Sequence, residues 1–200
     1  MSTRKSTNML SPVSITQLIH DEKAVKFRVN DSYLLSYRVF IKYFSRKRHI
    51  SIQDFIIGTH FTYGWMPTKL DLYFNKTPCT LKDATKILNR ARQSNVISIE
   101  ELKILRSVIN NSLVGTSKLL HFINPHAFPI WDSGVYHYIT KERPFTYRVE
   151  NPHHYLEYKS NCTALSEDSR FPPIHSSINS KLGYSVSSFR AIELIMFMNR

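Results

Sequence analysis

The chain has 200 residues and a mass of 23.4 kDa, and its 42% hydrophobic and 21% charged residues are typical of a globular domain. This composition excludes a miniprotein that depends on disulfides and an intrinsically disordered chain. Lys and Arg number 27 against 15 Asp and Glu, which gives a formal net charge of +12 and a pI of about 9.8. So large a positive charge favours a polyanionic partner, and nucleic acid is the first candidate.

The sequence disfavours membranes, metals and cofactors. No apolar run approaches the ~18 residues of a membrane span, and none follows the polar N-terminus as the core of a signal peptide would. Cys79 and Cys162 are far apart and lack the ligand spacing of a zinc or iron–sulfur site, and the nine histidines are scattered. We therefore expect a cytoplasmic, nucleoid-associated monomer with no membrane contact, no metal and no cofactor.

Apolar spacing and capping residues predict an all-α chain. Residues 1–30 form an N-terminal arm or one short helix. Asp31 or Ser32 caps a helix over residues 33–44. Three capping boxes, in which Ser or Thr is followed three residues later by Asp or Glu, predict the next helix starts at residues 51–54, 80–83 and 98–101.

The second half of the chain continues this pattern. Thr116 or Ser117 caps a helix over 118–123, and Asp132 caps a short helix over 133–139. Further helices begin at Asn151 with the following proline, and at Ser187 or Ser188. Residues 166–180 are rich in Ser, Asn and Pro and predict a long loop. We expect one domain over 1–200, with the arm 1–30, a helical lobe 31–145 and a C-terminal helical segment 146–200.

Two neighbouring stretches carry the most chemical information. In residues 114–118, Gly115 opens a predicted helix whose unpaired amides and positive dipole end suit a phosphate, which assigns DNA contacts to Gly115, Thr116 and Ser117. In residues 127–135, the chain runs from Pro129 to the isolated carboxylate of Asp132. Asp132 is then expected at the mouth of a cleft, with a plain N-cap as the structural alternative.

These stretches resemble the helix-hairpin-helix DNA glycosylases, in particular the adenine glycosylase and endonuclease III branch. Residues 128–135, Phe-Pro-Ile-Trp-Asp-Ser-Gly-Val, are similar to the family string that supplies the catalytic aspartate, and residues 112–115 are a reduced form of its hairpin. Asp132 follows Gly115 by 17 positions, about one helical turn fewer than in the family. The iron–sulfur loop of some members is absent. The resemblance implies a two-lobed helical bundle with the active site between its lobes.

The resemblance also implies the reaction. A modified or mispaired base is flipped out of double-stranded DNA and its N-glycosidic bond is hydrolysed, in repair or in defence against phage DNA. Asp132 stabilises the oxocarbenium character of the sugar. Some members use a lysine in the hairpin helix as a Schiff-base nucleophile, which makes Lys118 the second catalytic candidate. Aligning Gly115 with the hairpin glycine places Ser117 in that slot, so we expect a phosphate-contacting or solvated Lys118 and no lyase activity.

Two further groups complete the candidate site. Tyr63 and Trp65, beside Gly and Pro at a helix end, are candidates for stacking on the flipped base together with Trp131, and core packing is their alternative. The basic loop Arg46, Lys47 and Arg48 is a candidate for tracking phosphates, or a solvated connection. A non-catalytic DNA-binding module of the same fold is the alternative function. An all-α RNA-binding or antitoxin-like protein is a third.

Overall fold

A computed structural model describes residues 9–28, 30–66, 68–70, 72 and 80–200. Eleven α-helices and no strand occur within these ranges, beyond one isolated bridge between Leu72 and Ile109, and the all-α prediction is confirmed. The helices are α1 (Ile15–Glu22), α2 (Ser32–Ser45), α3 (Ile52–Gly64), α4 (Leu81–Gln93), α5 (Ile99–Val108), α6 (Leu113–Ile123), α7 (Ser133–Thr140), α8 (Thr146–Val149), α9 (Pro152–Glu167), α10 (Phe171–Leu182) and α11 (Ser188–Met198).

Local capping explains most helix starts. The three predicted boxes are present at α3, α4 and α5, where each Ser or Thr accepts from the third helical amide and the acid three residues later accepts from the cap amide. Asp31, Asp132, Asn151 and Ser187 cap α2, α7, α9 and α11 as predicted. In the N-terminal region, α1 settles the choice between an arm and a short helix in favour of the helix.

Two predictions about local structure are wrong. Residues 166–180 are not a loop, because α9 continues to Glu167 and α10 begins at Phe171 with prolines in its first turn, where no amide donor is needed. The helix that contains Gly115 begins at Leu113, and its cap is Ser112 rather than Thr116 or Ser117. The short helix α8 was not predicted.

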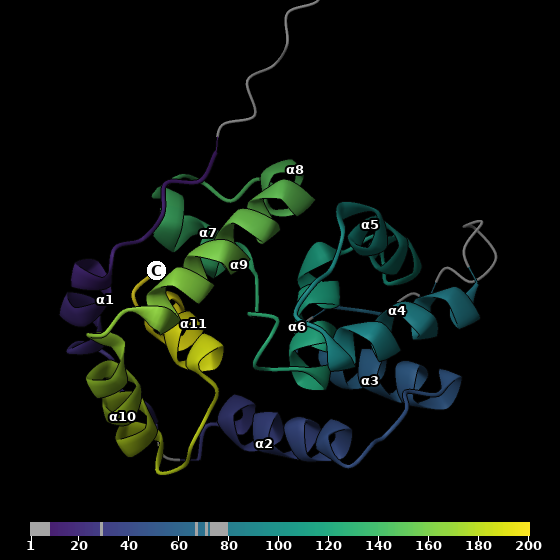
Figure 1. Cartoon of the computed structure of the whole chain (residues 1–200), viewed down its shortest axis with the longest axis horizontal. Helices are drawn as coiled ribbons and strands as arrows, with labels where there is room; N and C mark the ends of the chain where they lie inside the picture. Colours follow the sequence, from purple (N-terminus) through teal and green to yellow (C-terminus); the bar gives the residue numbers. More distant parts are fainter. Residues whose placement is uncertain (1–8, 29, 67, 71, 73–79) are drawn as a thin grey trace, which may run out of the picture.

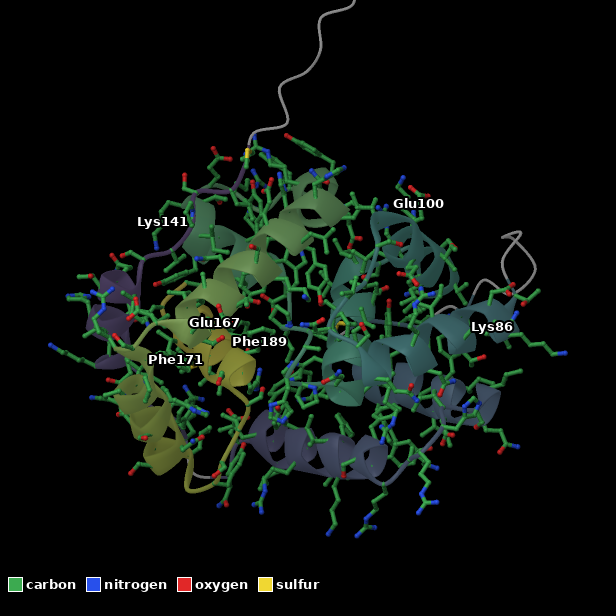
Figure 2. All side chains as sticks on the ribbon, in the orientation of Figure 1. Lys86, Glu100, Lys141, Glu167, Phe171 and Phe189 are labelled. Atoms are coloured by element: carbon green, nitrogen blue, oxygen red, sulfur yellow. The ribbon has the colours of Figure 1, made fainter. Side chains whose placement is uncertain are left out.

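The helices form two groups around two central helices (Figure 1). In one group α6 packs against α2, α3, α4 and α5, and in the other α11 packs against α1, α7, α9 and α10. α5 also contacts α9, and one continuous core of buried side chains runs through both groups. Charged side chains such as those of Lys86, Glu100 and Lys141 lie at the outer edge of the molecule (Figure 2). Each of the two central helices, α6 and α11, is thus surrounded by helices from its own group.

Gly58 lies at a close approach in the core. A Cβ atom there would lie 2.9 Å from Leu119 Cδ1 and closer still to the ring of Phe44, whereas a Cβ at Gly64 would have no neighbour within 4 Å. We expect Gly58→Ala to lower the free energy of unfolding, because overpacking costs about 1 to 3 kcal/mol and exceeds the gain in helix propensity of up to about 1 kcal/mol. Gly64→Ala should be neutral or stabilising. Urea unfolding of both variants checks this, and equal stabilities would contradict the close packing.

Candidate functional site

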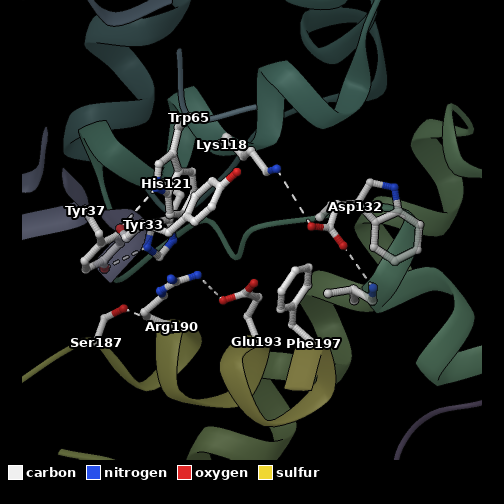
Figure 3. A network of polar contacts seen from close by, with 12 residues as sticks. Tyr33, Tyr37, Trp65, Lys118, His121, Asp132, Ser187, Arg190, Glu193 and Phe197 are labelled. Atoms are coloured by element: carbon white, nitrogen blue, oxygen red, sulfur yellow. Dashed lines mark hydrogen bonds and ion pairs between the residues drawn. The ribbon is translucent and has the colours of Figure 1, made fainter. Parts of the chain in front are cut away.

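A cavity of about 540 Å³ lies where α6, α11, the start of α7 and the start of α2 meet. This volume falls in the range of small-molecule sites, about 300 to 1,000 Å³. Four buried charged side chains line it (Figure 3): Lys118, Asp132, Arg190 and Glu193. Aromatic side chains form part of its walls: Tyr33, Trp65 and Phe197. The cavity therefore combines planar apolar surface with a charged interior.

Asp132 has two roles in this geometry. Its Oδ1 accepts from the amide of Val135 at 3.0 Å and so caps α7, and its Oδ2 lies 3.8 Å from Lys118 Nζ. The side chain of Asp132 is 12% exposed and that of Lys118 is 11% exposed. Asp132 is thus both a helix cap and a carboxylate that lines the cavity. The structure brings both candidate catalytic residues into one cavity.

Lys118 is not a solvated lysine, so that alternative is wrong, and its contact with a phosphate stays a prediction. It is buried on α6, and its ammonium lies 5.6 Å from the centre of the Trp65 ring. Burial lowers the pKa of Lys118 below its usual 10.5, with Arg190 acting in the same direction and the nearby carboxylates opposing it. Ser117, which the family alignment had placed in the lysine slot, is buried and exchanges hydrogen bonds with the backbone of Trp131 instead.

Arg190 and Glu193 were not predicted. They form an ion pair on α11, and they are only 4% and 3% exposed. Burial raises the pKa of Glu193 to about 7. The Arg190 guanidinium lies 5.3 Å from the centre of the Trp65 ring, and its Nε has no hydrogen-bond partner within the described ranges. The sequence signal was two opposite charges three residues apart inside an otherwise apolar terminal helix.

The prediction that the start of α6 contacts DNA is not supported by the structure, because the three residues concerned are buried. Gly115, Thr116 and Ser117 are all buried in the helix. The Gly115 amide donates to Ser112 Oγ at 3.0 Å, and the Leu113 amide donates to a carboxylate oxygen of Glu150. Glu150 therefore occupies the anion site that a helix N-terminus offers, where a DNA phosphate was expected.

Of the three predicted pocket aromatics, only Trp65 lines the cavity. Trp131 is fully buried and its indole Nε1 donates to the Val149 carbonyl at 2.8 Å. Tyr63 is 4% exposed and packs so closely on Gly115 that a Cβ there would lie 2.8 Å from its hydroxyl. Tyr63 and Trp131 are therefore core residues that do not line the cavity.

The basic loop lies away from the cavity. Arg46 and Arg48 are exposed, and Lys47 pairs with Asp54 at 2.7 Å. Leu34 lines the cavity at the start of α2, and Arg46 caps the other end of the same helix, which is about 18 Å away along the axis. The loop and the cavity are thus separate surfaces.

Comparison with known proteins gives no assignment. No family model matches the chain, and neither a curated protein nor a solved structure matches it. Over the described ranges, none of the helices has both the length and the apolar character needed to cross a membrane, and no three His, Cys, Asp or Glu side chains are grouped to hold a metal ion. The function must therefore be inferred from the cavity and its residues.

Proposed function

We propose that the protein is a monomeric DNA glycosylase of the helix-hairpin-helix type, which hydrolyses the N-glycosidic bond of a base extruded from double-stranded DNA. The observation that carries this proposal is that Asp132, the residue matched to the family's aspartate, lines a cavity of about 540 Å³. In this proposal the two helix groups are the two lobes. The hairpin is the turn between α5 and α6, where Asn110 and Asn111 adopt left-handed φ angles of 50° and 53°.

The cavity suits an extruded nucleotide. A base inside a duplex is inaccessible, and its extrusion costs a few kcal/mol that contacts in a pocket must offset. Tyr33, Trp65 and Phe197 offer aromatic faces for stacking. The buried charges of Arg190 and Glu193 offer hydrogen-bond donors and acceptors for its polar edge.

Asp132 would act on the sugar. As the bond between C1′ and the base nitrogen breaks, the electron pair leaves with the base and positive charge develops on the deoxyribose. A fixed carboxylate beside C1′ stabilises that charge, and it can accept the proton of the water that attacks C1′. The base takes up a proton, and the products are the free base and an abasic site. Because Oδ1 is held by the Val135 amide, the carboxylate needs no reorganisation.

The position of Lys118 favours a second candidate function, a glycosylase that also has lyase activity. Its Nζ is in the cavity beside Asp132, and burial lowers its pKa, which increases the share of neutral amine. A neutral amine can attack C1′, displace the base and form an imine that leads to strand cleavage. Borohydride reduction should then trap a covalent adduct of DNA with the wild type and none with Lys118→Gln. Base release without any adduct would instead establish the hydrolytic enzyme.

A base-release assay tests the proposal. Purified protein is incubated with DNA from several sources, including phage genomes with hypermodified cytosines, and we expect a free base and alkali-sensitive abasic sites. DNA binding without release from any source would favour the non-catalytic module. Binding of RNA without binding of DNA would favour the third hypothesis.

A further inference from the structure

Three cations surround the mouth of the cavity. Lys26 and Arg28 come from the segment between α1 and α2, and Arg200 follows α11. All three are exposed. None of them forms an ion pair with a carboxylate in the part of the chain that the structure describes. We call these three residues the cationic rim.

Arg200 lies close to the first turn of α7. Its guanidinium lies 3.8 Å from the centre of the Phe197 ring, and a Cβ on Gly134 would lie 2.7 Å from Arg200 Cδ. Gly134 is in the first turn of α7, which Asp132 caps. The same Cβ would lie 3.3 Å from Asp132 Oδ1, so the missing side chain at Gly134 leaves space for Arg200 on the side of α7 where Asp132 caps the helix.

The charges around the cavity do not balance. Five cationic side chains and three carboxylate side chains line it. Inside, Lys118 lies opposite Asp132 and Arg190 pairs with Glu193. The third carboxylate, Asp31, caps α2 by accepting from two of its first amides. The excess positive charge is thus at the rim, where an anionic group outside the cavity would meet it.

A phosphodiester fits this arrangement. A nucleotide inserted in the cavity carries one phosphate on each side, and both phosphates stay outside at the mouth. Lys and Arg side chains that are not paired with a carboxylate neutralise such phosphates at the least desolvation cost. The helix α6, in contrast, offers no free anion site, because Glu150 accepts from its first amide.

We propose that Lys26, Arg28 and Arg200 bind the phosphates that flank the extruded nucleotide and so hold its C1′ against Asp132. This inference rests on the proposed function and replaces the loop of Arg46 and Arg48 as the phosphate contact. The strand then crosses the mouth between the segment before α2 and the end of α11.

The test compares the salt dependence of DNA binding between the wild type and a variant of the cationic rim. In the rim variant all three residues are changed to Gln (Lys26→Gln, Arg28→Gln, Arg200→Gln), and the dissociation constant for a 20-base-pair duplex is measured at several salt concentrations. Each lost phosphate contact should lower the slope of log affinity against log salt by about one. We expect a slope reduced by about two to three and an affinity lowered about tenfold to a hundredfold at ~0.1 M salt.

A matched control removes the same charge from the other end of α2, at Lys42, Arg46 and Arg48, which are also exposed. This loop variant should keep the wild-type slope. An equal loss in both variants, or a loss in the loop variant alone, overturns the rim proposal. If the wild type releases a base and the rim variant keeps its affinity and slope, the rim fails and the proposed function stands. If the wild type binds no DNA, both fail.

Discussion

Asp132→Asn is expected to slow base release by at least about 100-fold while the fold and the DNA affinity stay close to wild type. The substitution removes the negative charge that stabilises the developing oxocarbenium ion. Asparagine is as good an N-cap as aspartate, so the hydrogen bond from the Val135 amide to Oδ1 at 3.0 Å can be kept and α7 should remain intact. The loss should therefore appear in the chemical step rather than in stability.

Single-turnover release of the base at saturating enzyme measures this step directly. Asp83→Asn is the matched control, because Asp83 accepts hydrogen bonds at the start of α4 and does not line the cavity. Its rate should equal that of the wild type. A wild-type rate for Asp132→Asn in a folded, DNA-binding protein would reduce Asp132 to a helix cap and end the glycosylase mechanism.

Helix starts were predictable because capping is local. Ser51, Thr80 and Ser98 each need only an acid three residues later, and all three boxes are present. The failures have local causes too. Prolines near residue 172 end a helix in most contexts, but in the first turn of α10 they remove no hydrogen bond. At α6 several Ser and Thr side chains competed as caps, and Ser112 took the position.

The site was predictable only in part. Asp132, Lys118 and Trp65 were chosen from sequence, and all three line the cavity. Arg190 and Glu193 lie about 60 to 75 residues beyond Asp132 and Lys118, and only the packing of α11 across from α6 brings them to the cavity. The burial of Lys118 in the cavity was also missed, because its direction was inferred by aligning Gly115 with the hairpin glycine, and a register error of one residue turns a side chain by about 100°.

Glu193 is expected to make the stability of the protein fall as the pH rises from 5 to 8. Burial raises the pKa of its carboxyl to about 7 from the usual 4.5. Below pH 4.5 the group is protonated in both the folded and the unfolded state, so it makes no pH-dependent contribution there. Between the two pKa values the unfolded chain loses the proton first, so the free energy of unfolding decreases, by about 2 to 3 kcal/mol up to pH 8.

Glu193→Gln removes this titration while keeping the size and an acceptor for Arg190. The difference in the free energy of unfolding between variant and wild type should therefore change by about 2 to 3 kcal/mol between pH 5 and 8, in favour of the variant at high pH. Taking the difference is necessary because buried His121, whose pKa is lowered to about 3, makes stability rise with pH over part of this range in both proteins. Urea unfolding at each pH measures the difference in the free energy of unfolding, and Glu100→Gln, at an exposed position, is the control. Parallel curves for Glu193→Gln and wild type would show that Arg190 and Lys118 keep this carboxylate ionised in the folded protein throughout the range.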